Sequence, residues 1–252
     1  MMEKEEVVFR SRIQDLARLA ERRGCVLYSD FLSLNEQSIL QELLPALPLS
    51  GCEWDGGYAQ AERKMAAFIP YYGDEPAFPI VCVRLVPANR KYAEKLTHRD
   101  ILGALMHLGM ERSRLGDIAV TEEEALIFCS EAFAQVICDE LRQVRHTSVV
   151  CSVCDEKELD YEPKMQRSRS SIASVRLDAL IAAAFHESRS SLLGLIEGGK
   201  VFVNGKQVTS NAFIPKENDI ISVRGMGRFR FSGQEGTSKK GRIWVSIDLF
   251  VS

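Results

Sequence analysis

Four basic side chains in the last third of the chain have the types and positions needed to bind phosphate. They are Arg176, Arg189, Lys200 and Lys206. Ser188 precedes Arg189 at the expected start of a helix, where free backbone N–H groups beside an arginine bind phosphate well. The chemistry we expect is therefore recognition of a polyanion, such as a nucleic-acid backbone, through ionic hydrogen bonds.

Three other motifs resemble enzyme or metal signatures but lack the partners that those signatures need. His98-Arg99-Asp100 is similar to a kinase catalytic loop, which requires an asparagine where Leu105 stands. Cys151 and Cys154 have the spacing of a zinc knuckle, but no second pair follows, and a strand would separate the two ligands. Ser190 lacks the glycines of a hydrolase nucleophile turn. We therefore predict no catalytic residue, no metal and no cofactor, in a protein that is not an enzyme.

The composition is that of a folded protein from a reducing compartment. The 252 residues are 46% hydrophobic and 27% charged, which excludes a disordered or fibrous chain. No apolar run reaches the roughly 20 residues of a membrane span, and the N-terminus is acidic where a signal peptide is basic. Seven scattered cysteines, an odd number, indicate reduced and packed thiols. We therefore expect a cytoplasmic protein that makes no membrane contact.

Charge is divided unevenly along the chain. Residues 1–163 contain 18 basic and 28 acidic side chains, a net charge of −10, whereas residues 164–252 contain 14 and 7, a net charge of +7. A basic C-terminal segment on an otherwise acidic chain is typical of a protein that binds a polyanion through one domain. The change falls within residues 155–171, which lack apolar periodicity and which we predict to be a mobile linker.

The pattern of the first third predicts a helical domain. Apolar residues recur at helical spacing over residues 5–23. A second helix is expected over residues 35–45, with Asn35 as its N-cap. The flexible pair Gly56-Gly57 leads into a third expected helix, which ends before Pro70.

The middle third of the sequence alternates between predicted strands and predicted helices. We expect strands at residues 80–86, 117–120, 125–129 and 147–153, and helices at residues 98–108 and 130–144. This βαββαβ order is that of an RRM-like domain, which packs both helices on one sheet face and leaves the other face open. RNA binding by such a face requires exposed aromatic side chains, and the central strands offer Phe128 alone. We therefore expect this sheet to be a scaffold or a protein-contact surface.

The basic end is predicted to contain two short helices and a hairpin. The first helix carries Leu177, Leu180 and Ile181 on one side and has Ser174 as its N-cap. The second helix begins after Ser188 and ends at Gly198-Gly199. A hairpin follows, because Asn204-Gly205 tolerates the positive φ angles of a type I′ turn.

This end of the chain resembles the S4 RNA-binding domain in the order and spacing of its motifs. The motifs are Arg176-Leu177-Asp178, Ser188-Arg189-Ser190, Ile196, Gly199-Lys200-Val201-Phe202-Val203-Asn204-Gly205 and Asp219-Ile220-Ile221-Ser222-Val223. S4 domains bind structured RNA with the two helices and the loop before the hairpin. The resemblance therefore implies that Arg176, Ser188, Arg189, Lys200 and Asn204 lie at the RNA face, while Asp178 and the leucines hold the fold.

Further motifs, spread over nearly the whole chain, resemble the bacterial YlmH family. They include Gly56-Gly57-Tyr58, Ala61-Glu62-Arg63, His98-Arg99-Asp100, Leu102-Gly103-Ala104, Gly116-Asp117-Ile118, Ser222-Val223-Arg224-Gly225, Gly227-Arg228 and Lys240-Gly241-Arg242. The chain departs from this pattern at Met226, where a basic residue is expected. The resemblance implies a ribosome-associated factor that binds the large subunit carrying an obstructed peptidyl-tRNA and assists nascent-chain rescue and quality control.

The sequence thus predicts an α+β protein with three domains. They are a helical N-terminal domain (1–75), an RRM-like domain (76–155) and, after a linker (156–172), an S4 (αL-type) RNA-binding domain with a C-terminal β extension (173–252). The predicted RNA-binding residues are Arg176, Ser188, Arg189, Ser190, Lys200, Asn204, Lys206, Arg224 and Arg228. The expected partners are ribosomal RNA, the large ribosomal subunit and peptidyl-tRNA, with the acidic front domains orienting the protein or contacting another protein. Two alternatives stay open: an RNA-modifying enzyme, although no cofactor or adenylate motif is found in residues 1–163, and a cell-division adaptor.

Overall fold

The computed structural model describes residues 2–154, 161–238 and 241–251. The chain divides into two compact units, Met1–Tyr161 and Glu162–Ser252, and we describe each by itself. Within the described ranges, no helix has both the length and the apolar character needed to cross a bilayer.

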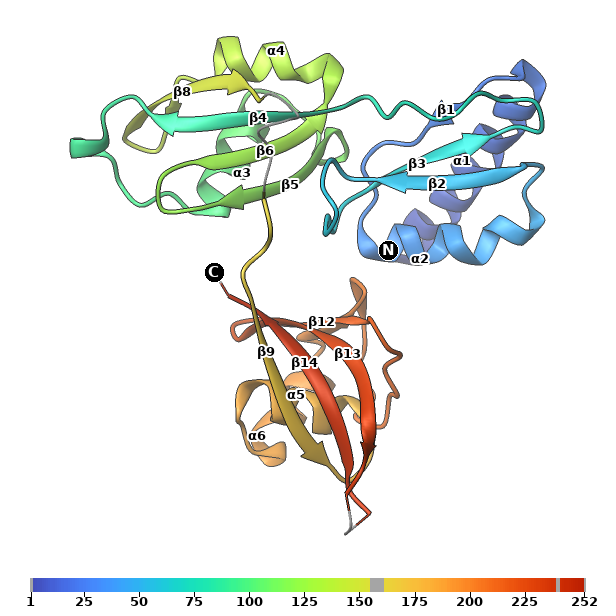
Figure 1. The fold of residues 1–252 in the computed structure, drawn as a ribbon, viewed down its shortest axis with the longest axis vertical. Helices are drawn as coiled ribbons and strands as arrows, with labels where there is room; N and C mark the ends of the chain where they lie inside the picture. The colour runs from blue at the N-terminus through green and yellow to red at the C-terminus, as the bar shows by residue number, and fades with distance from the viewer. Residues whose placement is uncertain (1, 155–160, 239–240, 252) are drawn as a thin grey trace. The chain divides into compact units, whose positions relative to one another are not determined.

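The front of the first unit is a small α/β layer in which helices α1 and α2 cover one face of a three-stranded sheet (Figure 1). Its elements are α1 (Met2–Arg23), β1 (Leu27–Tyr28), α2 (Leu34–Leu43), the 3₁₀ turn Leu44–Ala46, β2 (Gly51–Asp55) and β3 (Met65–Ile69). The antiparallel strand order is β1-β3-β2, so β3 is central. Ile13 and Ala17 of α1 pack with Leu40 of α2 against Phe68 of β3.

Two expectations for this region are wrong. Helix α2 is capped by Ser33 rather than Asn35, because the Ser33 side chain and Glu36 form a reciprocal capping box. The helix expected before Pro70 is instead strand β3, so the N-terminal domain is not purely helical. Residues 65–68 are buried on both faces of β3, and a short apolar run that is buried all round has no periodicity to separate strand from helix.

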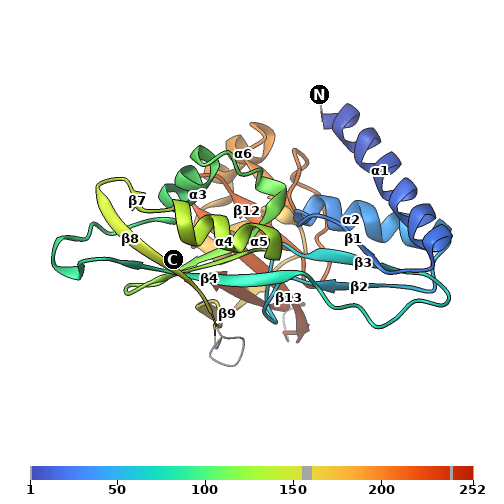
Figure 2. The same cartoon turned by 90° about the horizontal axis from the view of Figure 1, so that it is seen from above.

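The rest of the first unit has the predicted alternation of strands and helices, except that the helix expected over residues 130–144 ends at Glu140 and residues 143–144 form a short strand. Its elements are β4 (Ile80–Pro87), the 3₁₀ turn Arg90–Tyr92, α3 (His98–His107), the 3₁₀ turn Arg112–Arg114, β5 (Leu115–Val120), β6 (Ala125–Ser130), α4 (Glu131–Glu140), β7 (Gln143–Val144) and β8 (Thr147–Val153). The strands form one antiparallel sheet in the order β5-β6-β4-β8-β7. Figure 2 shows α3 and α4 on the same face of this sheet, where Ile101, Leu105 and Ile137 are fully buried. Thr97 is the N-cap of helix α3 and forms a capping box with Asp100.

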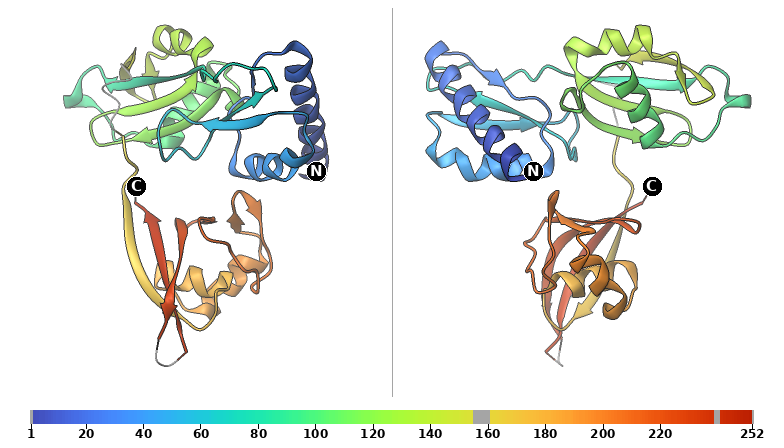
Figure 3. Two further views of the ribbon diagram at one scale, coloured as in Figure 1. Left: turned by 45° about the vertical axis from the view of Figure 1, so that its right-hand side comes forward. Right: turned by 180° about the vertical axis from the view of Figure 1, so that it is seen from behind.

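The second unit is a six-stranded antiparallel sheet with two helices on one face (Figure 3). Its elements are β9 (Met165–Ile172), α5 (Leu177–Phe185), α6 (Arg189–Glu197), β10 (Val201–Val203), β11 (Lys206–Gln207), β12 (Ile220–Val223), β13 (Gly227–Thr237) and β14 (Ile243–Phe250). The strand order is β11-β10-β12-β13-β14-β9. Leu177, Leu180 and Ile196 of the helices pack on Phe229 and Phe231 of β13, so one face of the sheet belongs to the core.

The predicted linker and the predicted first helix cap of this unit are both corrected. Residues 165–172 are strand β9, which pairs over its full length with β14, whereas residues 155–160 lie outside the described part of the chain. The strand has a polar sequence because it is the last strand of the sheet and half of its side chains point away from the core. Helix α5 has Arg176 at its N-cap position, with no side-chain bond, rather than Ser174.

Candidate nucleic-acid interface

The first predicted RNA-binding residue, Arg176, is held at the start of α5 by an ion pair. Its Nε lies 3.1 Å from Oδ1 of Asp178, a carboxylate that is almost fully buried. The Arg176 side chain is 43% exposed, and a guanidinium paired with one carboxylate keeps further N–H donors. Asp178 thereby restrains the position of the Arg176 side chain at the start of α5.

The start of α6 has the geometry that the sequence predicts. Ser188 is the N-cap, and its hydroxyl accepts a hydrogen bond of 3.3 Å from the Ser191 N–H. His186 takes the left-handed conformation, with φ of 56°, at the end of α5, which separates the two helices. Arg189 and Ser190 occupy the first turn of α6, but their side chains lie outside the described part of the structure.

Tertiary structure brings Lys200 and Arg224 together. The Arg224 N–H donates to the Lys200 carbonyl oxygen at 2.9 Å, while the Lys200 N–H is bonded to the Leu195 carbonyl at the end of α6. Both side chains are exposed, and the Arg224 guanidinium lies 4.8 Å from the centre of the Phe202 ring. Two cations that are distant in sequence thus lie beside each other, Lys200 just before β10 and Arg224 just after β12.

Asn204 has a structural role in this fold. Its side-chain nitrogen donates to Asp219 at 2.8 Å, and its side-chain oxygen accepts from the Ile220 N–H at 2.9 Å. With φ of 47° it also forms the tight turn between β10 and β11 together with Gly205. Both polar atoms of the Asn204 amide have protein partners, so we assign the residue to joining the hairpin to β12.

We expect Asn204→Ala to destabilise the protein by about 3 kcal/mol. The substitution removes two hydrogen bonds, and alanine adopts the left-handed backbone conformation of this position less readily than asparagine does. Asn204→Gly removes the same bonds without the backbone strain and should cost about 1 kcal/mol less. Urea unfolding of the two variants measures both numbers. Equal stability of Asn204→Ala and the wild type would contradict this role.

The remaining predicted residues lie on the sheet. Lys206 is exposed on β11, and the Arg228 guanidinium on β13 lies 4.6 Å from the centre of the Phe250 ring. Lys240, from the family motif in the tail, lies outside the described residues. Arg176, Ser188, Lys200, Lys206 and Arg224 are thus placed at the helix starts and at the edge of the sheet nearest the hairpin.

The first unit contains a half-buried polar network that sequence reasoning missed. The Asp117 carboxylate accepts hydrogen bonds from the Tyr58 hydroxyl (2.7 Å), the Glu62 N–H (2.7 Å) and the Arg63 N–H (3.2 Å). The Arg63 guanidinium donates to carbonyl groups of Phe31 and of Leu115 at 2.7 and 2.9 Å. These bonds fix the front α/β layer to β5.

Burial sets the ionisation of this network. Arg112 belongs to the same network, because its guanidinium donates to the Leu115 carbonyl oxygen at 2.7 Å. Burial lowers the pKa of Arg112 to about 10, and repulsion from the positive charge of Arg63 lowers it further in the same direction. Burial also lowers the pKa of Arg63 and raises that of Tyr58, the latter with a contribution from Asp117. The motifs Gly56-Gly57-Tyr58, Ala61-Glu62-Arg63 and Gly116-Asp117-Ile118 therefore act in fold assembly.

The sequence predicts that the sheet face opposite α3 and α4 is open. In the structure the centre of this face is covered. Phe128 is completely buried, and the Tyr58 ring lies on it with the ring centres 4.7 Å apart. Tyr161 in turn packs edge-on against Tyr58 at 5.3 Å. Gly57 permits this approach, because a Cβ atom there would meet the Phe128 ring at 2.6 Å. Base stacking on Phe128 is thus blocked.

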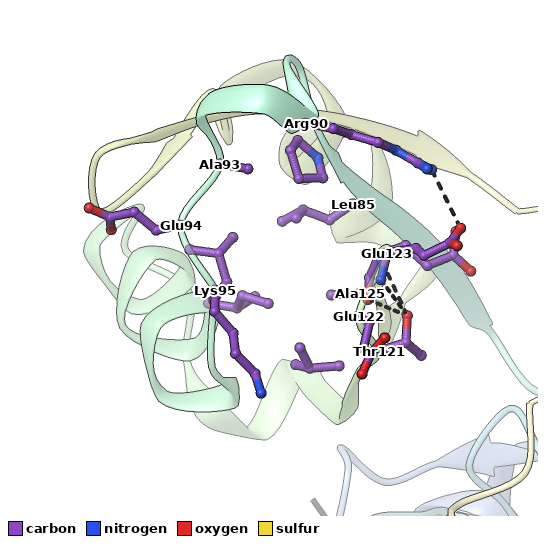
Figure 4. A pocket seen from close by; sticks show the side chains of 14 residues that line it. Leu85, Arg90, Ala93, Glu94, Lys95, Thr121, Glu122, Glu123 and Ala125 are labelled. Atoms are coloured by element: carbon purple, nitrogen blue, oxygen red, sulfur yellow. Dashed lines mark hydrogen bonds and ion pairs between the residues drawn. The ribbon is translucent and has the colours of Figure 1, made fainter.

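A pocket of about 380 Å³ lies at one end of this domain (Figure 4). Its floor is apolar, with Leu85 and Ala125, and its rim carries Lys95, Glu122 and Glu123. The Thr121 hydroxyl donates to the Glu124 carbonyl at 3.0 Å, which commits it to the β5–β6 turn. Charged and apolar groups are present, but no nucleophile is paired with a base.

The two cysteines with zinc-knuckle spacing lie on opposite faces of the sheet. Cys151 packs in the core under the helices, with Sγ 3.7 Å from the Leu141 carbonyl oxygen. Cys154 packs with Phe128 on the other face, where its Sγ lies 3.3 Å from that of Cys82. Within the described residues, no group of three or more His, Cys, Asp or Glu side chains is arranged to hold a metal ion.

Comparison with known proteins identifies both parts of this arrangement. Residues 175–221 match the family model "S4 domain", and residues 77–158 match the model "Putative RNA-binding domain in YlmH". No catalytic domain is identified.

Two relatives extend the match beyond single domains. The "Ribosome-associated protein quality control protein P2" of Bacillus subtilis (strain 168) is 31% identical over 251 residues, which are 97% of this chain and 95% of that protein. The structure titled "Cell division protein ylmH from Streptococcus pneumoniae" has a TM-score of 0.52 and 26% identity over 61% of this chain and 93% of that one. With its matches to the S4 domain and to the YlmH domain model, and with a relative that matches it nearly end to end, the chain belongs to the YlmH family.

Proposed function

We propose that this protein is a non-enzymatic, cytoplasmic RNA-binding factor of ribosome rescue and quality control. It docks on ribosomal RNA of the large subunit when that subunit carries an obstructed peptidyl-tRNA. The observation that carries the proposal is the match to a protein named for ribosome-associated quality control, which spans 97% of the chain and so includes both units. Membership of the YlmH family and the S4 domain support an RNA ligand.

In this proposal the S4 domain makes the RNA contacts. This proposal is supported by the ion-paired Arg176, the capped start of α6 and the adjacent Lys200 and Arg224, which offer cations and N–H groups of the kind that bind phosphates. The proposed contact residues are Arg176, Ser188, Arg189, Ser190, Lys200, Lys206, Arg224 and Arg228. Asn204 shapes the hairpin between them.

The front of the chain has a different part in the proposed function. The strand order β5-β6-β4-β8-β7 supports the RRM-like domain that we propose for this region, but the sheet face is covered at Phe128, and residues 1–163 carry a net charge of −10. A negative surface does not favour phosphate. We therefore assign the front layer (1–75) and the RRM-like domain to orienting the S4 domain or contacting protein on the ribosome.

Sedimentation of the tagged protein from cell lysate on sucrose gradients tests this function. At low salt we expect co-migration with the large subunit, and at moderate salt progressive release, because each neutralised phosphate steepens the dependence of log affinity on log salt by about 0.7 to 0.9 units. Wild-type protein that stays at the top of the gradient at low salt would contradict the proposal. Binding that is unaffected by salt would contradict its ionic basis.

A second candidate function is that of a cell-division adaptor. It is favoured by the printed title of the Streptococcus pneumoniae relative, which names a cell division protein. In that case the acidic front unit would bind a division protein directly. Co-purification with such a protein that survives nuclease and high salt would support the adaptor, whereas loss under either treatment would favour the ribosomal function.

A further inference from the structure

We propose that the outer face of the C-terminal sheet is a second RNA site, which binds unpaired nucleotides by stacking bases on aromatic and arginine side chains. We define this outer sheet face as Arg167, Arg169, Arg228, Arg230, Trp244 and Phe250. This face lies on β9, β13 and β14. Of its six residues, Arg228 alone is also among the RNA-binding residues predicted from the sequence. The inference goes beyond the proposed function, because the S4 resemblance assigns RNA contacts to the helices and the hairpin.

Strand register places these side chains on the side of the sheet opposite α5 and α6. On β13, Phe229 and Phe231 are buried against the helices, so Arg228 and Arg230 point away from them. On β14, Val245 and Ile247 face the core, so Trp244 and Phe250 point outward in the same way. The partners of Asp248 on its two neighbouring strands are Arg230 and Arg167, which continues the face onto β9.

Arginines and rings alternate at contact distance across this face. The Arg169 guanidinium carbon lies 4.5 Å from the centre of the Trp244 ring. Arg228 and Arg230 lie 4.6 and 5.8 Å from the centre of the Phe250 ring. Trp244 and Phe250 are partly exposed, so each ring retains surface that a base can cover. The arrangement combines a π-stacking platform with cations, which is the chemistry that holds single strands.

Acidic side chains on this face orient the arginines and leave them able to bind phosphate. Asp248 is almost fully buried and bonds Arg167 at 2.8 and 3.1 Å, while Glu235 bonds Arg169 at 2.7 Å. The side chains of Arg167 and Arg169 remain 72% and 55% exposed. A guanidinium has five N–H donors, so a pair with one carboxylate leaves donors for a phosphate oxygen.

The ligand that this chemistry fits is unpaired RNA. Bases inside a duplex are already stacked on each other, and only unpaired bases have free faces to lay on a ring. A protein partner would instead favour a contiguous apolar patch, whereas charged side chains separate the two rings here. Because stacking accepts every base, the site should bind single strands with little sequence preference.

The test is fluorescence anisotropy of the full-length protein with a labelled oligouridine of about 15 nucleotides, a length typical of single-strand sites. Trp244→Leu combined with Phe250→Leu removes both rings and keeps every charge. We expect this variant to bind oligouridine at least tenfold more weakly, because each stacked base contributes about a factor of ten. Its affinity for inorganic polyphosphate, which has no bases, should change less than twofold.

A conservative variant and a matched control accompany this measurement. Arg169→Lys with Arg230→Lys preserves charge but removes planar stacking, and we expect about a threefold to tenfold loss for oligouridine with the fold intact. The control Tyr72→Leu removes a ring that is 97% exposed in the first unit and should have no effect. Thermal unfolding establishes that all variants are folded.

Two outcomes would overturn the inference. One is unchanged oligouridine affinity in folded Trp244→Leu/Phe250→Leu and Arg169→Lys/Arg230→Lys variants. The other is an equal loss for oligouridine and polyphosphate, which would indicate a face that attracts anions without stacking. Sedimentation with the large subunit is measured separately, so a wild-type protein that binds oligouridine through this face but stays off the ribosome would refute the proposed function alone.

Discussion

Reversing two charges in the S4 domain, with Arg189→Glu and Lys200→Glu together, is expected to weaken binding to the large subunit at least about 100-fold. Each side chain in the proposed site gives a charge-assisted bond to phosphate worth about 1.5 kcal/mol, and each glutamate adds repulsion. On a sucrose gradient at low salt, the double variant should remain at the top while the wild type co-migrates with the subunit.

A matched control separates a specific site from general charge. Lys164→Glu with Lys216→Glu changes the net charge of the same domain by the same amount, at two exposed lysines outside the proposed contact set. We expect this control to weaken binding less than tenfold, through long-range electrostatics alone. Equal losses in the two double variants would show that the site is misplaced.

A large loss of stability, about 3 kcal/mol, is also expected from Asp117→Ala in the first unit. The substitution leaves the Tyr58 hydroxyl and two backbone N–H groups without their acceptor, next to the half-buried arginines Arg63 and Arg112. Because these bonds join the front α/β layer to β5, the front layer should lose protection from hydrogen exchange first. Urea unfolding and hydrogen exchange measure the two effects.

Asp15→Ala is the control for that experiment. Asp15 is 70% exposed and pairs with Arg18 across one helical turn at 3.4 Å. Such a surface pair contributes about 0 to 1 kcal/mol, so the free energy of unfolding should change little. A cost below about 1 kcal/mol for Asp117→Ala as well would mean that the polar network does not hold the unit together.

Several features set by neighbouring residues were predictable, although the N-caps of α2 and α5 were not. The Ser188 cap, the glycines that end α6 and the Asn204-Gly205 turn each depend on a few adjacent φ angles and side chains, and the structure has all three. The βαββα order of the middle domain followed from periodicity, because each element there is long enough to show one face. Family motifs located Arg176, Lys200 and Arg224 in sequence without showing which of them meet.

Features set by strand pairing were not predictable. Met65–Ile69 was assigned to a helix and Met165–Ile172 to a linker, because what makes each a strand is a partner far away in sequence. The same reason hid the covering of Phe128 by Tyr58, since two remote segments meet there. It also hid the outer sheet face, whose arginines and rings come from three strands.

The sequence by itself thus determined the family, the uneven charge and the positions of the S4 motifs, since composition and local spacing survive without coordinates. Tertiary structure decided that Asn204 joins the hairpin to β12, that Lys200 and Arg224 are adjacent, and that Arg63 and Asp117 fasten the front layer. The physical reason is that a hydrogen bond or a ring contact requires two groups within a few ångströms, and strand register together with loop packing sets which distant residues satisfy that condition.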